Sequence, residues 1–250
     1  MKHLSFIFIG FAFFSMTGFS GQDSVLKNSG DTDITDLSRI RIQHARELLG
    51  HEHLRYTLFR TESSEDIDAF VRASTKKFLK KRDEKKAPQI ADAMIKASVQ
   101  YSFDPMFLMA LILNESSFNP RMKGSAGEIG LMQVLPATAE WIAKKYHIAY
   151  RGAKTLYDPA INIKIGSAAL DQLRQQFDSE SRLYVSAYNI GARKVRSMVS
   201  DNNAPKEYVQ AVMKRYLALY RGFKASGNMQ ERINLAWVST VKVTQAKEID

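Results

Sequence analysis

One apolar helix that carries an acidic residue at its end constrains this sequence more than any other feature. The stretch Ala110–Gln133 reads ALILNESSFNPRMKGSAGEIGLMQ and joins this helix to a Gly-rich loop. Asp104 suits the N-cap and Pro105 suits the first helical position. The helix must end before Pro120, because a residue that precedes proline is driven out of the helical region. Glu115 is therefore expected in its last turn.

The predicted helix places Glu115 on its apolar face, at helical spacing from three apolar residues: Leu108, Leu111 and Ile112. Burial beside apolar side chains raises the pKa of a carboxyl group, and the negative end of the helix dipole acts in the same direction. A carboxyl group that keeps its proton near neutral pH is suited to general acid catalysis. The alternative that spacing allows is a Glu paired with Arg121 or Lys123 at the surface.

Composition narrows the classes of function. The chain has 250 residues, of which 45% are apolar, enough for one sizeable domain with a smaller appendage. It has no cysteine, which excludes a disulfide framework and thiolate zinc sites. A formal charge of +10 is compatible with an acidic partner, such as nucleic acid, an anionic membrane surface or an anionic polymer, but does not by itself select one. No nucleic-acid-binding motif accompanies this charge. His51-Glu52-His53 lacks the spacing of a zinc protease. We expect no metal, no cofactor and no nucleic acid as partner.

The N-terminus has the pattern of a secretory signal. A short polar start is followed by an apolar run, Leu4–Phe14, and then by small and polar residues up to Gly21. The run is shorter than the ~20 residues that span a bilayer. We therefore expect a signal peptide over residues 1–20 and a periplasmic or otherwise exported protein of the cell envelope. A retained membrane anchor is the alternative.

The rest of the chain is expected to be all-α. Residues 21–87 are interpreted as a linker and a helical N-terminal region, with helices over 37–60 and 64–81. The charge run Lys76–Lys86 is interpreted as a solvated helix surface, with contact to an anionic membrane surface as the alternative. Residues 88–222 form the main domain and 223–250 a C-terminal tail, where the alternation in Trp237–Val243 predicts a short strand.

Four short motifs occur in order along the main domain. They are Glu115-Ser116 with Asn119-Pro120, then Gly130-Leu131-Met132-Gln133, then Ala187-Tyr188-Asn189 with Gly191, and finally Tyr208-Val209. Together they resemble the signature of the soluble lytic transglycosylase family, whose murein-cleaving domain is lysozyme-like. The resemblance covers roughly residues 88 to 222. It implies a lysozyme-like helical catalytic domain that acts on peptidoglycan glycan strands.

The resemblance also implies roles for individual residues. Glu115 would protonate the oxygen between N-acetylmuramic acid and N-acetylglucosamine, and then act as base while the muramyl 6-hydroxyl attacks. The product would carry a 1,6-anhydromuramyl end. Tyr208 would hydrogen-bond the catalytic carboxyl, and Ser116 would support the turn that follows it. The residues expected to bind the glycan are Ser125, Met132, Gln133, Tyr188, Asn189 and Tyr208.

Two loop positions depart from the family pattern. The family commonly has a Ser nine residues after the acid, where this chain has Gly124 followed by Ser125, and a small apolar residue where this chain has Glu128. Glu128 is interpreted as a solvated loop charge or as a second carboxylate that would permit hydrolysis. The alternatives are therefore a hydrolytic muramidase or a non-catalytic peptidoglycan-binding scaffold. In the scaffold, the basic N-terminal helices would organise a cell-envelope complex.

Overall fold

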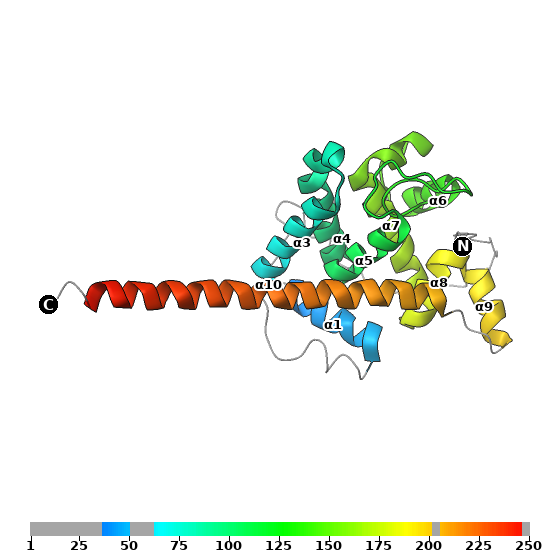
Figure 1. Ribbon diagram of the computed structural model, residues 1–250. Coiled ribbons are helices and arrows are strands. Elements are labelled where there is room, and N and C mark those ends of the chain that lie inside the picture. Colours follow the sequence, from blue (N-terminus) through cyan, green and yellow to red (C-terminus); the bar gives the residue numbers. More distant parts are fainter. Residues whose placement is uncertain (1–36, 51–62, 202–205, 247–250) are drawn as a thin grey trace.

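The computed structural model describes residues 37–50, 63–201 and 206–246 (Figure 1). Side-chain surroundings are described as far as residue 226. Within these ranges the structure is helical, and its extended segments form only isolated bridges. The all-α prediction is confirmed. The predicted signal peptide, the linker and the His51-Glu52-His53 segment lie outside the described residues.

Proline residues and polar N-cap residues mark where several of the helices begin. Three helices begin with a proline in their first turn directly after an N-cap residue, and at two of these caps an Asp side chain accepts backbone N–H bonds. In chain order the elements are α1 (Leu37–Leu49), α3 (Ser64–Phe78), the 3₁₀ helix η3 (Lys81–Lys86), α4 (Ala87–Tyr101), α5 (Pro105–Glu115), α6 (Pro136–Lys145), the 3₁₀ helix η4 (Ala153–Tyr157), α7 (Pro159–Gln176), α8 (Ser181–Ile190), α9 (Ala192–Ser200) and α10 (Glu207–Ala246).

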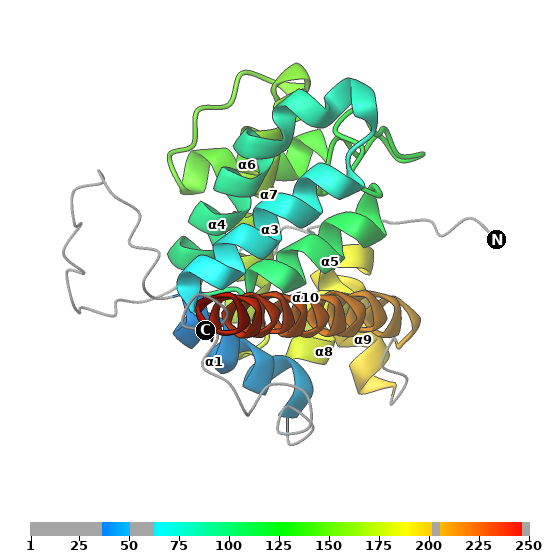
Figure 2. The ribbon, with the colours of Figure 1, turned by 60° about the vertical axis from the view of Figure 1, so that its left-hand side comes forward.

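Helix α5 lies at the centre of the molecule, packed against α3, α4 and α10 (Figure 2). Its first eight residues, from Pro105 to Ile112, are all buried. The expectation of one apolar face was therefore too narrow, because a helix that is apolar on every side is buried on every side. The predicted boundaries are confirmed, since Asp104 caps the start and Glu115 is the last helical residue.

The N-terminal helices share the core of the main domain. Leu37 of α1 and Ile67 and Val71 of α3 are fully buried, and α1 contacts α3, α4 and α8. The charge run Lys76–Lys86 is not one solvated helix. It spans the end of α3 and all of η3, and Asp83 within it is only 1% exposed.

Helix α10 crosses the molecule and then extends beyond it (Figure 1). The predicted strand over Trp237–Val243 is wrong, because α10 continues through this segment to Ala246. The expected boundary between domain and tail, after residue 222, falls inside this single helix. None of the helices in the described part of the chain combines the length and the apolar character needed to cross a bilayer.

Candidate active site

Glu115 is the last residue of α5, and the chain turns sharply after it. The backbone N–H of Ser116 donates to the carbonyls of Ile112 and Leu113, and its hydroxyl donates to Ile112 O at 3.2 Å. Ser117 and Phe118 then adopt positive φ angles of 50° and 58°. The side chain of Phe118 is 1% exposed, so burial of this ring holds the turn in its uncommon conformation.

The carboxyl group of Glu115 is half-buried and accepts a hydrogen bond from the hydroxyl of Tyr208 on α10. Desolvation by burial raises its pKa to about 7, and the charge of Glu128 acts in the same direction. Hydrogen bonds from Tyr208 and Asn114 oppose this shift. Glu115 in turn raises the pKa of Tyr188, which places that tyrosine beside it. The result is a carboxyl group that is partly protonated at neutral pH.

The loop after Glu115 is held by backbone contacts and by one buried amide. Ile129 forms isolated bridges with Lys123 and Val134. Asn162 on α7 is fully buried and accepts from Met132 N at 2.8 Å. Its amide donates to the carbonyls of Ile129 and Leu156 at 2.8 and 3.0 Å. No motif pointed to Asn162, and the one available signal was a polar residue in an apolar stretch of a predicted helix.

Two of the residues expected to bind glycan have buried side chains near Glu115. Met132 is fully buried and packs against Gly166, while its carbonyl accepts from the hydroxyl of Tyr188 at 2.9 Å. Gln133 is 5% exposed, and its amide donates to the carbonyls of Gly130 and Met122 at 2.9 and 3.4 Å. In this structure both side chains shape the loop.

Tyr188 and Tyr208 use their hydroxyls within the chain, whereas Ser125 and Asn189 have open polar groups. Ser125 is exposed at the tip of the loop. Asn189, which follows Tyr188 on α8, has a buried Oδ1 atom without a hydrogen-bond partner among the described residues. An unpaired buried acceptor is costly unless a ligand supplies the missing donor. The structure therefore leaves Asn189 open to a donor from outside the chain.

Glu128 is buried and is not a solvated loop charge. It is 2% exposed, and its Oε2 accepts from the backbone N–H of Ala126 at 3.0 Å. Its charge contributes in a minor way to the raised pKa of Glu115, after desolvation by burial. The first of the two interpretations of Glu128 is therefore wrong.

Arg121 does not neutralise Glu115. Its guanidinium group contacts the two carboxylate oxygens of Asp83 in η3 at 3.1 and 3.3 Å. Phe78, at the end of α3, packs on Phe118 with ring centroids 5.3 Å apart. The N-terminal region thus contacts the segment after Glu115 through a ring pair and through an ion pair in which only the carboxylate is buried.

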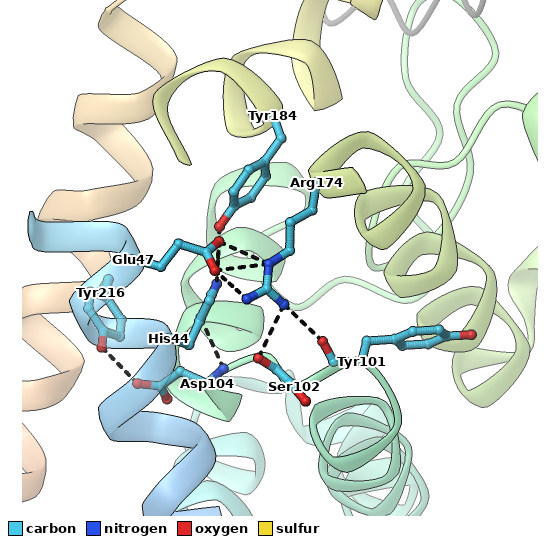
Figure 3. A network of polar contacts seen from close by, with 8 residues as sticks. All are labelled: His44, Glu47, Tyr101, Ser102, Asp104, Arg174, Tyr184 and Tyr216. Atoms are coloured by element: carbon cyan, nitrogen blue, oxygen red, sulfur yellow. Dashed lines mark hydrogen bonds and ion pairs between the residues drawn. The ribbon is translucent and has the colours of Figure 1, made fainter. Parts of the chain in front are cut away.

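A second polar network lies at the N-terminal end of α5, around its N-cap residue Asp104 (Figure 3). His44 of α1 accepts a hydrogen bond from Asp104 N at its Nδ1, 3.1 Å away, so its Nε2 carries the proton and donates to Tyr184 on α8 at 3.0 Å. The Asp104 carboxylate accepts from the Tyr216 hydroxyl of α10 at 2.7 Å. Arg174 of α7 binds Glu47 and the backbone carbonyl of Tyr101. Desolvation raises the pKa of Asp104 to about 6.

The described stretches contain no group of three or more His, Asp or Glu side chains arranged to hold a metal ion.

The helical fold and the buried acid at the end of a central helix define a lysozyme-like helical domain. Residues 92–211 match the model of the transglycosylase SLT domain. The solved complex of the 70-kDa soluble lytic transglycosylase with bulgecin A resembles the chain with a TM-score of 0.50 and 24% identity. This likeness covers 79% of the chain and 37% of that protein, and it supports the fold.

Part of the chain is also similar in sequence to lytic murein transglycosylases. A putative soluble lytic murein transglycosylase of Haemophilus influenzae is 38% identical over 94 residues, which are 38% of this chain and 16% of that protein. A membrane-bound lytic murein transglycosylase C of Actinobacillus succinogenes is 35% identical over 123 residues, which are 46% of this chain and 34% of that protein. The chain thus spans a minor part of the length of these relatives.

Proposed function

We propose that the protein is a peptidoglycan lytic transglycosylase with Glu115 as its acid and base. The observation that carries this proposal is the position of Glu115, half-buried at the end of an apolar helix, bound by Tyr208 and with a pKa raised to about 7. The match of residues 92–211 to the SLT domain and the named murein transglycosylase relatives support the substrate class.

The proposed reaction needs one carboxyl group. Glu115 donates its proton to the glycosidic oxygen between N-acetylmuramic acid and N-acetylglucosamine, and the bond from that oxygen to the muramyl C1 breaks. The 2-acetamido group assists at C1, with Asn189 Oδ1 as the acceptor for its N–H. The muramyl 6-hydroxyl then bonds to C1, and its proton returns to the carboxylate of Glu115. Water is not consumed, and the product carries a 1,6-anhydro ring.

The structure also supports roles for the neighbouring tyrosines. Tyr208 orients the carboxyl group through its hydroxyl. Tyr188 donates to Met132 O, which ties α8 to the loop beside Glu115. Because the loop residues Met132 and Gln133 are buried, their contribution to glycan binding is to shape the loop, whereas Ser125 and Asn189 contact the glycan directly.

The second candidate is a hydrolytic muramidase, and the burial of Glu128, whose charge acts on Glu115, is the observation that favours it. Mass spectrometry of the soluble products from purified murein separates the two. Anhydromuropeptides that disappear in Glu115→Gln support the transglycosylase, whereas reducing ends support hydrolysis. Binding to murein without any product would support the non-catalytic scaffold.

We further propose that the protein is exported to the periplasm or cell envelope after cleavage near Gly18-Phe19-Ser20, and that its catalytic domain spans residues 88–222. Cell fractionation with N-terminal sequencing of the mature protein tests export. An uncleaved N-terminus in the membrane fraction would support a retained anchor instead.

A further inference from the structure

The turn directly after Glu115 has an uncommon backbone conformation. Ser117 and Phe118 are consecutive residues with positive φ angles of 50° and 58°, and neither is a glycine. A side chain makes this left-handed region unfavourable, so contacts from elsewhere in the molecule must hold the turn. Within the turn, Asn119 N donates to the carbonyl of Ser116 at 3.0 Å. Since Glu115 is the residue directly before this turn, a change in the turn changes the direction of its side chain.

The first contact that holds the turn comes from the end of α3. The ring of Phe118 is 1% exposed and packs on the ring of Phe78, with centroids 5.3 Å apart and ring planes inclined by 38°. Phe78 is the last residue of α3, and Leu79 directly after it is buried as well. The end of α3 therefore covers the side chain on which the conformation of the turn depends.

The second contact comes from η3. The guanidinium group of Arg121 binds both carboxylate oxygens of Asp83, and the backbone N–H of Arg121 donates to Asn119 Oδ1 at 3.1 Å. The carboxylate of Asp83 is buried, and its other cationic contact is Arg82 Nε at 3.4 Å. Loss of one member of such a pair leaves a buried charge uncompensated, which is costly. The ion pair thus ties the residues that follow the turn to η3.

Both contacts come from residues that precede the match to the SLT domain, which begins at residue 92. The segment that supplies them is firmly packed. Ile67 and Val71 of α3 are fully buried in the same core as α5, α3 contacts α4 and α5, and η3 contacts α4. The turn is therefore held by a rigid part of the molecule outside the matched residues.

We infer that Phe78 and Asp83 are positioning residues, which act through Phe118 and Arg121 to hold the turn after Glu115 and thereby orient its carboxyl group for proton transfer. This inference deepens the proposed function and rests on it for its catalytic meaning. Orientation of the acid contributes to the rate of the chemical step, so a misdirected acid lowers kcat while substrate still binds. The catalytic unit then extends N-terminally of residue 88 and includes α3 and η3.

The first test compares two ring pairs made by the same helix. Phe78→Leu removes the ring that packs on Phe118, whereas the control Phe70→Leu removes the ring that packs on Phe223 of α10, with centroids 5.1 Å apart. Both phenylalanines are half-buried, so the two variants should lose similar melting temperature. We expect Phe78→Leu to lower kcat on soluble murein strands roughly tenfold with little change in KM, and Phe70→Leu to leave kcat unchanged. Equal effects on kcat, or a change in KM alone, would overturn the inference.

A double-mutant cycle tests the ion pair. Asp83→Asn and Arg121→Gln should each lower kcat roughly fivefold, and the double variant should be no slower than the slower single variant, because both act through one pair. Losses that multiply in the double variant would show that the two residues act separately. A rise in KM confined to Arg121→Gln would assign Arg121 to glycan binding. Either result would overturn the role of Asp83.

A measurement that needs no catalysis separates this inference from the proposed function. The backbone N–H groups of Ser116, Ser117 and Asn119 are hydrogen-bonded, and NMR reports their hydrogen exchange. Exchange should be faster in Phe78→Leu and Asp83→Asn than in the wild type, and unchanged in Phe70→Leu. This result without murein cleavage by the wild type would support the hold on the turn and contradict the proposed function. Unchanged exchange in Phe78→Leu and Asp83→Asn would overturn the inference whatever the activity.

Discussion

The two ends of α5 carry two acids that have the same kind of partner, a tyrosine of α10, but differ in their electrostatic surroundings. Asp104 at the start and Glu115 at the end each accept a hydrogen bond from a tyrosine of α10, Tyr216 and Tyr208 respectively. Burial raises the pKa of both, to about 6 and about 7. Helix α10 therefore runs antiparallel to α5 and binds both of its ends.

The difference lies in what compensates each charge. Asp104 accepts from Met106 N at 2.8 Å, lies at the positive end of the helix dipole and feels the charge of Arg41. Glu115 lies at the negative end of the same dipole, and the charge of Glu128 opposes its ionisation. The comparison shows that position along one helix gives two similar acids different surroundings: the charge of Asp104 is compensated as an N-cap, whereas that of Glu115 is not.

Replacing Glu115 should have the largest effect on activity. Glu115→Gln keeps the size of the side chain and removes the proton that is transferred, so murein cleavage should fall by about 10²–10⁴-fold. The rate of release of soluble muropeptides measures this, with circular dichroism to show an unchanged fold. Retention of more than a tenth of the activity would assign the acid to another residue.

Replacing Asp104 should instead affect stability. Asp104→Ala removes the N-cap, the hydrogen-bond acceptor of the Tyr216 hydroxyl and the negative charge that attracts Arg41. The free energy of unfolding should therefore fall by about 3 kcal/mol. Urea denaturation measures the loss. Activity per folded molecule should stay near that of the wild type, and a selective loss of kcat would contradict the structural role.

The raised pKa of Glu115 also predicts a pH-dependent stability difference. A carboxyl group whose folded pKa lies above its unfolded value loses stability as pH rises from about 4.5 through about 7. Glu115→Gln should therefore be more stable than the wild type at pH 8, by on the order of 1–2 kcal/mol, and similar to it below pH 4.5. Melting curves across this pH range measure the difference, and a constant offset would contradict the prediction.

Removing the hydroxyl of Tyr208 or of Tyr216 should have the smallest effect. Tyr208→Phe should lower activity roughly tenfold, because loss of about 1 kcal/mol of hydrogen bonding releases the orientation of Glu115. Tyr216→Phe should lower stability by about 1 kcal/mol and leave kcat unchanged. Equal effects of the two variants on activity would show that the ends of α5 are not functionally distinct.

Much of α5 could be predicted because its signals are local. Asp104, Pro105 and Pro120 act on the backbone within a few residues of themselves, and the structure places the helix ends where these residues require them. The same holds for the starts of α6 and α7, which depend on Pro136 and on Asp158-Pro159. The position of Glu115 at a helix end was readable in the same way.

The strand expected over Trp237–Val243 shows where local reading fails. Alternating β-branched residues favour a strand, yet this preference depends on context and is overridden here by the continuation of α10. A helix already nucleated by packing of its earlier turns extends at little further cost. The residue pattern of a short segment carries no information on whether the preceding residues already form a packed helix.

The helical class and the limits of α5 could be predicted from the sequence alone, because they follow from caps and prolines, and motif spacing singled out Glu115 as the proposed acid. The burial of Glu128 over Gly124, the contact of Arg121 with Asp83, and the binding of opposite ends of α5 by Tyr216 and Tyr208 could be read only from the folded structure. The physical reason is separation along the chain. Desolvation and ion pairing depend on which distant segments pack together, and local backbone preferences do not specify that packing.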